Sequence, residues 1–338
     1  MKQTIAVISG GTNSEHEVSL SSTKAILANL DKKKYKILPL QITKENKWID
    51  EKGRGVNPFD LPKLSDVVFP VLHGPYGEDG TIQGLLKLLH LPYVGCGVTA
   101  SALCMDKVLQ KNVCQSYHLP VVPFFWFTKG EWDENRASVL SNLSRKLPTS
   151  SFPLFVKPAN QGSSVGITKV KNKKELVSGI QLAFTRDTKV LVEQGVKNVR
   201  EIECSVLGPN HAPESSVLGE IIPGNKFYDY NAKYLDNNSE AIIPAKLPAK
   251  LAGEIRATAS LAFQVLDCFG LARVDFLLNS KTKKFYLNEL NTMPGFTPIS
   301  MYPKLWETSG LPFPKLLDKL INLALIRHQE KLSLSLNH

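Results

Sequence analysis

The sequence predicts a mixed α/β (α+β) protein of two or three domains. First, the chain has 338 residues, of which 43% are hydrophobic and 21% charged, as in globular proteins that bury a sizeable core. Second, short apolar runs in the first third alternate with segments whose apolar residues recur at helical spacing. Third, residues 272–278 and 285–291 alternate in polarity around a short polar link, which predicts a β-hairpin.

Composition and charge exclude several classes of protein. No apolar run approaches the ~20 residues of a membrane helix, and the first residues predict a strand and a turn rather than a signal peptide. The net charge of +10 suits nucleic acid or small anionic ligands, but the basic residues are spread along the chain, so we expect no nucleic-acid binding. The five cysteines lack paired spacing, which favours reduced thiols in a cytoplasmic protein.

The first third of the chain predicts an open parallel sheet. Strands are expected at 4–9, 36–41 and 67–72, and a helix follows the first of them. The intervening glycines form neither a dinucleotide fingerprint nor a phosphate-binding loop. Glu15, where that helix begins, is explained either by the helix dipole or by ligand binding. Residues 73–80 form a turn-rich loop at the carboxyl end of a strand, where such sheets bind ligands.

The middle of the chain has side chains suited to a nucleotide. Residues 99–117 predict one helix that includes Lys107, and a strand ends at Lys157. Residues 162–166 read Gly-Ser-Ser-Val-Gly, a turn that either cradles phosphate with its backbone N–H groups or is an ordinary hairpin loop. Residues 224–239 are polar and aromatic without periodicity, which predicts a functional lid. Further helices and strands are expected at 121–127, 131–150, 167–170, 173–184, 190–194, 201–208, 251–265 and 306–333.

The C-terminal hairpin has the residue types of a metal site. Strand alternation and a register centred near residue 282 place Asp275 opposite Glu289. We expect Glu289 and Asn291 to share one face with Leu287. Two carboxylates and an amide oxygen are hard ligands that suit Mg²⁺, although a solvated sheet face with ordinary charges has the same pattern. If the two carboxylates are buried, Arg273 offsets only one of them, which favours bound cations.

Seven motifs, in one order, resemble those of the D-alanine–D-alanine ligases of the ATP-grasp superfamily, and the likeness runs from about residue 4 to residue 325. The motifs are Gly-Gly-Thr-Asn-Ser-Glu-His-Glu-Val-Ser (10–19), His-Gly-Pro-Tyr-Gly-Glu-Asp-Gly (73–80), Met-Asp-Lys (105–107), Val-Lys-Pro-Ala-Asn-Gln-Gly-Ser-Ser-Val-Gly (156–166), Tyr-Asp-Tyr-Asn-Ala-Lys-Tyr (228–234), Ala-Arg-Val-Asp-Phe (272–276) and Asn-Glu-Leu-Asn-Thr-Met-Pro-Gly-Phe-Thr (288–297). A single Gly-Ser-Ser turn would be weak, whereas the ordered set is specific.

The resemblance implies a three-domain ATP-grasp fold, with an N-terminal open parallel sheet at 1–97 and two antiparallel-sheet α+β domains at 98–193 and 194–338 that grip ATP. It implies a cytoplasmic homodimer that joins two D-alanines through D-alanyl phosphate, for peptidoglycan synthesis, cell wall biogenesis and cell shape. It also implies two Mg²⁺ ions, which Mn²⁺ can replace, and no membrane or nucleic-acid partner. The alternative within the family is a ligase whose second substrate is D-lactate or D-serine. Tyr234, and the absence of charge at Met301, favour the dipeptide.

The resemblance also implies roles for individual residues. Those expected around ATP are Lys107, Lys157, Ser164, Glu193, Gln194, Val196, Glu201, Tyr228 and Lys233. Those expected to ligate the metals are Asp275, Glu289 and Asn291. Those expected around the amino acids are Glu15 on the first ammonium with His73 nearby, Arg273 and the Gly295 backbone on the oxyanion, Ser300 on the second carboxylate with Met301 beside it, and Ser163 with Tyr234 as a proton relay reaching Glu15. Gln194 stands where a lysine is frequent in the family, which weakens only its side-chain assignment.

Overall fold

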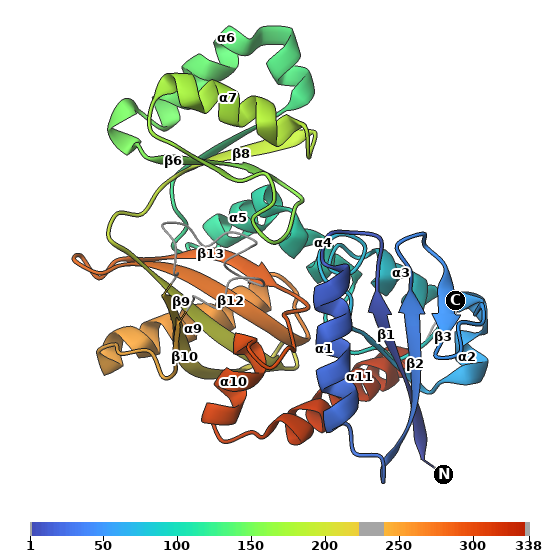
Figure 1. The fold of residues 1–338 in the computed structure, drawn as a ribbon. Helices are drawn as coiled ribbons and strands as arrows, with labels where there is room; N and C mark the ends of the chain where they lie inside the picture. Colours follow the sequence, from blue (N-terminus) through green and yellow to red (C-terminus); the bar gives the residue numbers. More distant parts are fainter. Residues whose placement is uncertain (1, 223–239, 335–338) are drawn as a thin grey trace.

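The computed structural model describes residues 2–222 and 240–334, and three β-sheets form its framework. In Figure 1 the N-terminal and C-terminal sheets lie side by side, and the central sheet stands above them on the helices α4 and α5. The predicted lid, with Tyr228, Lys233 and Tyr234, lies outside the described residues. The mixed α/β architecture confirms the predicted fold class, whereas the division of the chain after residues 97 and 193 stays a prediction.

The N-terminal sheet has the order β3-β2-β1-β4. Strands β1 (Gln3–Gly10), β2 (Tyr35–Ile42) and β4 (Val67–Pro70) are parallel, as predicted, and β3 (Trp48–Asp50) adds an antiparallel edge strand that the sequence pattern had not indicated. Ile5 to Ile8 are fully buried, as expected for a parallel strand covered on both faces. The accompanying helices are α1 (His16–Asn29), α2 (Leu61–Leu64) and α3 (Thr81–Leu88).

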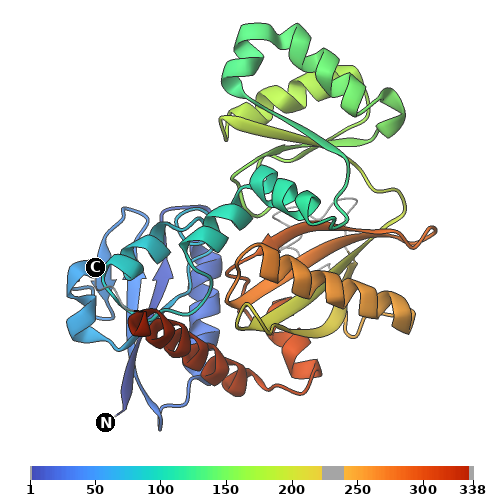
Figure 2. The same cartoon turned by 180° about the vertical axis from the view of Figure 1, so that it is seen from behind.

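The central sheet is antiparallel, with the order β5-β8-β6-β7. Its strands are β5 (Phe124–Thr128), β6 (Leu154–Pro158), β7 (Thr168–Val170) and β8 (Lys189–Gln194). Helices α6 (Lys129–Lys146) and α7 (Lys173–Phe184) cover one face, where Leu154 and Val156 join their core (Figure 2). Strand alternation therefore turns Phe155 and Lys157 to the opposite face, toward the C-terminal sheet.

The C-terminal sheet is also antiparallel, with the order β11-β10-β9-β12-β13. Its strands are β9 (Val199–Gly208), β10 (Glu214–Ile222), β11 (Glu240–Ile242), β12 (Gly270–Asn279) and β13 (Phe285–Asn291). Ile202, Cys204 and Val206 of β9 point into the core beneath α9 (Ala249–Val265), as predicted. The other face of β9 and β12 has polar residues. Strand β10 was not predicted from the sequence.

The C-terminal hairpin has the predicted register at its functional end, because Asp275 pairs with Glu289. The prediction that Leu287 shares a face with Glu289 is wrong. A β-bulge at Asn288 makes Leu287 pair with Phe276, and the extra residue inverts the alternation. Leu287 therefore lies in the core, while Glu289 faces a cavity.

Residues 99–117 form two helices rather than the single predicted helix. Helix α4 (Val98–Met105) ends at Asp106, and α5 (Lys107–Ser116) begins there. The Asp106 carboxylate accepts from the backbone N–H groups of Val108 and Leu109, so Asp106 is an N-cap that restarts the chain in a new direction. As a result Lys107 stands at the first position of α5, where its N–H donates to Ala159 of the central sheet.

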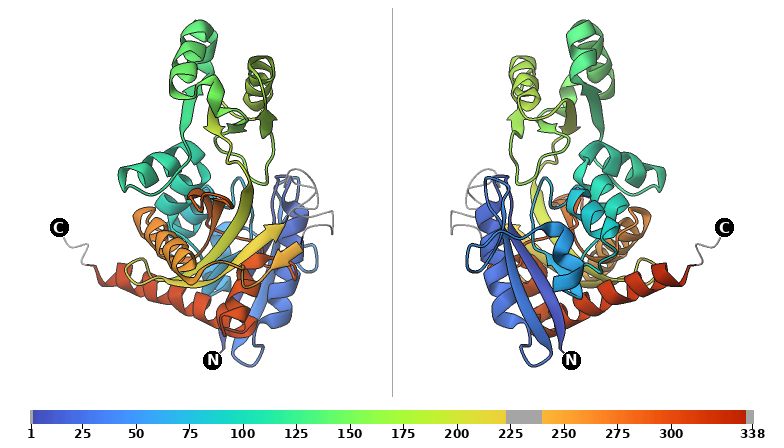
Figure 3. Two further views of the ribbon diagram at one scale, coloured as in Figure 1. Left: turned by 90° about the vertical axis from the view of Figure 1, so that its left-hand side faces the viewer. Right: turned by 90° about the vertical axis from the view of Figure 1, so that its right-hand side faces the viewer.

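The last two helices join the N-terminal and C-terminal sheets. They are α10 (Met301–Thr308) and α11 (Phe313–Ser333), so the helical region begins five residues before the predicted start at 306. Helix α11 runs along the base of the molecule (Figure 3), and one core includes Phe69, Phe296 and Leu320. In the described part of the chain no helix combines the length and apolar character needed to cross a membrane.

Candidate active site

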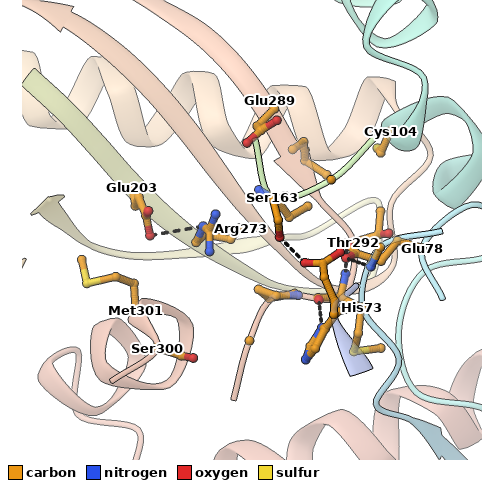
Figure 4. A pocket seen from close by; sticks show the side chains of 18 of the residues that line it. His73, Glu78, Cys104, Ser163, Glu203, Arg273, Glu289, Thr292, Ser300 and Met301 are labelled. Carbon is orange, nitrogen blue, oxygen red and sulfur yellow. Dashed lines mark hydrogen bonds and ion pairs between the residues drawn. The ribbon is translucent and has the colours of Figure 1, made fainter. Parts of the chain in front are cut away.

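Two cavities meet where the three sheets approach one another. The first, of ≈ 400 Å³, is lined by residues from all three sheets and their loops, and the second, of ≈ 200 Å³, lies between the central and C-terminal sheets. Figure 4 shows the first cavity. Residues that line both are Lys107, Ser163, Glu203 and Glu289. A group bound in one cavity therefore lies next to a group bound in the other.

Glu15 joins the N-terminal sheet to the Gly-Ser-Ser loop. Its carboxylate caps no backbone N–H of α1, and instead accepts a hydrogen bond from the Ser163 hydroxyl. The backbones of Gly74 and Gly162 press against it, since a Cβ on either would lie 2.0 Å or 2.9 Å from Glu15 Oε2. The Glu15 carboxylate thus lines the first cavity, where a ligand could reach it, and its binding role stays a prediction.

His73 is buried in the wall of the first cavity, and both of its ring nitrogens contact protein groups. Nδ1 lies 2.9 Å from the Met293 carbonyl oxygen, which can only accept, so Nδ1 bears the proton. Nε2 then accepts from the Ser22 hydroxyl at 3.0 Å. Burial lowers the pKa of His73, although the nearby Glu15 raises it, and the ring is held neutral. Its expected contact with the first amino acid stays a prediction.

Glu78 is a cavity residue that sequence reasoning missed. Its two carboxylate oxygens accept from the backbone N–H of Gly74 at 2.9 Å and of Met293 at 3.1 Å. Glu78 therefore ties the loop after β4 to the loop after β13. Burial and the nearby Glu15 carboxylate raise the pKa of Glu78 to about 8, against the two backbone donors.

Arg273 lies between two acids on the open face of the C-terminal sheet. Its guanidinium makes a bidentate pair with Asp275, at 2.7 Å and 2.6 Å, and approaches Glu203 at 3.2 Å. Glu203, Asp275 and Glu289 are direct neighbours across β9, β12 and β13. Arg273 lines the first cavity and Asp275 the second, so this row of acids lies along the seam between them.

The residues predicted to hold metal ions come together in the structure. Asn291 donates its Nδ2 to Asp275 at 3.1 Å, which leaves its amide oxygen free to act as a ligand. Among the described residues no group of three or more His, Cys, Asp and Glu side chains forms a complete metal site. Mg²⁺ at phosphate-transfer sites takes one or two carboxylates and fills its other positions with phosphate and water, so the donor set of Asp275, Glu289 and Asn291 fits it.

The second cavity is walled by a buried network of charges. Glu193 lies between Lys157, with which it forms an ion pair, and Lys111, whose Nζ is 3.2 Å from Glu193 Oε2. The side chains of Lys111 and Glu193 are 1% and 2% exposed. Burial alone would raise the pKa of Glu193, but the two ammonium groups outweigh it and hold the pKa below its ordinary value. The network has two positive charges and one negative, so it favours an anion.

Of the other described residues expected around the nucleotide, four line a cavity and one, Gln194, does not. Ser164, Val196 and Glu201 line the second cavity. Lys107 is buried at the junction of the two cavities, where its ammonium donates to the Gln161 carbonyl at 2.7 Å and lies 3.8 Å from Glu289. Gln194 ends β8 beside Glu193 and is not among the described residues that line either cavity.

The far end of the first cavity is formed by the loop before α10. The Ser300 hydroxyl accepts from the Thr297 N–H at 3.0 Å and lies 2.8 Å from the Thr297 hydroxyl. If Thr297 donates both hydrogen bonds, the Ser300 proton remains available to a ligand in the cavity that Ser300 lines. The Gly295 backbone packs against this hydroxyl, because a Cβ there would lie 2.7 Å from Ser300 Oγ. Met301 lies beside Ser300, buried on the same wall (Figure 4).

Sequence signals for the missed residues were partial. Glu203 follows Glu201 by two positions on a strand already predicted, so alternation alone places it on the same face. Lys111 follows Lys107 by four positions, which puts both on one side of a helix. Glu78 lies inside the motif at residues 73–80, but nothing local singled it out, because its role depends on Met293, more than two hundred positions away in the chain.

Family comparisons agree across the chain. A family profile described as "D-ala D-ala ligase C-terminus" matches residues 113–322, and one described as "D-ala D-ala ligase N-terminus" matches residues 4–63 and 51–96. The D-alanine–D-alanine ligase of Thermoanaerobacter sp. (strain X514) is 50% identical over 360 residues, with 98% of each protein covered.

Solved structures give the same grouping. The VanG D-Ala:D-Ser ligase from Enterococcus faecalis superposes with a TM-score of 0.86 at 35% identity, covering 96% of this chain and 100% of the other. The D-alanine–D-alanine ligase from Bacillus anthracis complexed with ATP superposes with a TM-score of 0.78 at 30% identity, covering 97% of this chain and 99% of the other.

Removing the charge of Glu193 should destabilise the protein strongly. In Glu193→Gln the ammonium groups of Lys111 and Lys157 face each other in a buried site without a counter-charge, at a cost of about 3–5 kcal/mol. Adding Lys111→Met to that variant should recover part of the loss. Denaturant unfolding of the single and double variants measures both effects.

Glu214→Gln is the matched control, because it removes one acid from an exposed ion pair with Lys319 and should change stability by no more than about 1 kcal/mol. A Glu193→Gln protein as stable as this control would contradict the account of the buried network.

Glu78 should make stability depend on pH. Its pKa in the folded protein, about 8, is above its ordinary value of 4.5, so the folded state binds the proton more tightly than the unfolded state. This stabilisation is complete below about pH 4.5 and is lost as the pH rises through 8. In Glu78→Gln the fall in unfolding free energy between pH 5 and 8.5 should be smaller than in the parent by roughly 2–4 kcal/mol, after allowance for partial exposure.

Urea unfolding of the ligand-free protein across this pH range gives the comparison. Glu17→Gln, which removes an exposed acid from the start of α1, serves as the control and should leave the pH profile unchanged. Parallel profiles for the parent and Glu78→Gln would show that the Glu78 pKa is not raised.

Proposed function

The chain belongs to the D-alanine–D-alanine ligase family, and from that premise we propose that its two cavities perform the two steps by which ATP joins two D-alanine molecules. ATP occupies the second cavity and the amino acids occupy the first. The observation that supports this arrangement best is the shared wall of Lys107, Ser163, Glu203 and Glu289. A phosphoryl group passed from nucleotide to amino acid has to cross such a junction, and the reaction needs positioning and charge stabilisation there.

In the first step a carboxylate oxygen of the first D-alanine attacks the terminal phosphorus of ATP. The bond from phosphorus to the ADP oxygen breaks, so ADP and D-alanyl phosphate are formed. Glu15 holds the ammonium of this D-alanine, because it is the buried acid that faces the cavity beside the Gly-Ser-Ser loop. Lys107, at the junction of the two cavities, and Lys157, in the wall of the second cavity, hold the phosphates.

Asp275, Glu289 and Asn291 are proposed to ligate two Mg²⁺ ions, for which Mn²⁺ can substitute. When bound, the ions would neutralise negative charge on the phosphates. The protein itself contributes the placement of the three oxygens, because the cross-strand pair of Asp275 and Glu289 fixes two of them. Arg273 keeps Asp275 oriented through two hydrogen bonds.

In the second step the amine of the second D-alanine, after losing a proton, attacks the carbonyl carbon of D-alanyl phosphate. The new C–N bond forms and phosphate leaves with the oxygen that came from the first carboxylate. Arg273 and the Gly295 N–H stabilise the oxyanion that develops between these events. Ser300 holds the second carboxylate, and the Ser163–Glu15 contact lies where the proton would leave, although Tyr234 of the predicted relay is outside the described residues.

The alternative second substrates are D-serine and D-lactate. The fold is compatible with a different acceptor, since a solved relative is titled a D-Ala:D-Ser ligase. The buried apolar side chain of Met301 beside Ser300 favours the small methyl group of D-alanine over a polar acceptor. We also propose that the protein forms a homodimer in the cytoplasm. Light scattering tests the oligomeric state, and cell fractionation tests the location.

The direct test is an assay with ATP, Mg²⁺ and D-alanine that follows ADP and the mass of the product. We expect ADP formation that depends on D-alanine, and one dipeptide for each ADP. D-serine and D-lactate added as competing acceptors should give minor products. ADP formation that ignores D-alanine would reject the proposal, and a main product that contains D-serine or D-lactate would select the alternative.

Replacing Arg273 with alanine should lower turnover at saturating substrate by about 10²–10³-fold, because one well-placed oxyanion donor contributes that much. Arg200 provides a matched control: it makes a bidentate pair with Glu220 at 2.7 Å and 2.6 Å in the same sheet and lines neither cavity. Arg200→Ala should therefore keep nearly normal turnover. Equal turnover in the Arg273→Ala and Arg200→Ala enzymes would remove Arg273 from the chemical step.

A further inference from the structure

Lys304 is a cation of the first cavity to which neither the motifs nor the predicted roles give a function. It is half-buried on α10 and lines the cavity together with Ser300 and Met301. It follows Ser300 by four positions and Met301 by three, so the three side chains lie on one side of the helix start. Figure 4 shows Ser300 and Met301 on the α10 wall, across the cavity from Glu203 and Arg273.

The charges around the first cavity favour a cation beside the acceptor. Among the described residues four acids line it, Glu15, Glu78, Glu203 and Glu289, and the raised pKa of Glu78 removes much of its negative charge near neutral pH. A second amino acid enters with a carboxylate of its own, and placing another negative charge in this environment is costly unless a cation accompanies it. The Ser300 hydroxyl offers a hydrogen bond but no charge.

Two other cations line the cavity among the described residues, and both contact protein groups elsewhere. Lys107 lies at the seam, where it donates to the Gln161 carbonyl and approaches Glu289. Arg273 is held by Asp275 on one side and by Glu203 on the other. Within residues 2–222 and 240–334, the Lys304 ammonium makes no ion pair or hydrogen bond with the protein. Its charge is therefore available to a ligand at the Ser300 end of the cavity.

We propose that Lys304 selects the acceptor by pairing with its carboxylate. The Ser300 hydroxyl and the Lys304 ammonium would hold the two ends of that carboxylate, and the amine of the acceptor then points toward the acyl carbon. This role rests on the proposed function and adds to it: Lys304 determines that the acceptor is a carboxylate, whereas the rest of the pocket determines whether it is D-alanine or another 2-substituted acid.

A partition experiment isolates this choice. The parent enzyme receives ATP, Mg²⁺, D-alanine and an excess of D-alaninamide, which has the same amine and methyl group but a neutral amide in place of the carboxylate. D-alaninamide cannot be the donor, because it lacks the carboxylate that is phosphorylated. Both products, the dipeptide and its amide, therefore arise from the same D-alanyl phosphate, and their ratio by mass spectrometry reports acceptor choice alone.

We expect Lys304→Met to lower the ratio of dipeptide to dipeptide amide by about 10-fold or more, the effect of losing one charge-assisted hydrogen bond. Lys304→Arg should keep the ratio near that of the parent. Lys315→Met, which removes an exposed lysine from the next helix, is the control for loss of charge and should leave the ratio unchanged. Lys304→Gln gives a second neutral variant should the methionine variant fold poorly.

A ratio in both neutral Lys304 variants equal to that of the parent would overturn the proposal, as would the absence of amide product from all of them. Failure of the proposed function gives a different result, because the parent enzyme would then form neither product from D-alanine and ATP.

Discussion

Repulsion within a row of three carboxylates is the constraint on which the site depends. Glu203, Asp275 and Glu289 are neighbours across three adjacent strands and lie on one face of the sheet. Like charges directly opposite one another destabilise a sheet, so this row exists only where cations offset it. Arg273 lies between two of the acids, and Lys107 approaches the third at 3.8 Å. The metal ions proposed to bind here would offset the remaining negative charge.

Much of the surrounding structure positions those cations. The Asp106 cap breaks the helical region and sets Lys107 at the start of α5, against the central sheet. One turn later on the same helix, Lys111 enters the buried network with Glu193 and Lys157. The bulge at Asn288 then turns Glu289 toward the cavities while Leu287 fills the core. Each departure from regular geometry in this region therefore positions a charge.

The sequence predicted the parts of this site that depend on local pattern. The short hairpin link and strand alternation were enough to pair Asp275 with Glu289, and the motif likeness assigned the remaining ligand residues. The bulge at Asn288 was not predicted, because one inserted residue leaves no periodic signal. The roles of Glu78 and Lys111 were not predicted. Their partners, Met293 and Glu193, are distant in the chain and become neighbours only after folding. The break at Asp106 was recognisable, since an acid before a helical segment is an ordinary N-cap signal.

In the proposed reaction a phosphoryl group crosses the seam onto the first amino acid before the peptide bond forms. D-alanine labelled with ¹⁸O in both carboxylate oxygens tests it directly. The phosphate released during dipeptide synthesis should contain one ¹⁸O atom, because the attacking carboxylate oxygen leaves with the phosphorus. Released phosphate without the label, alongside normal dipeptide formation, would contradict it, since the bond to phosphorus would then have been made by some other oxygen.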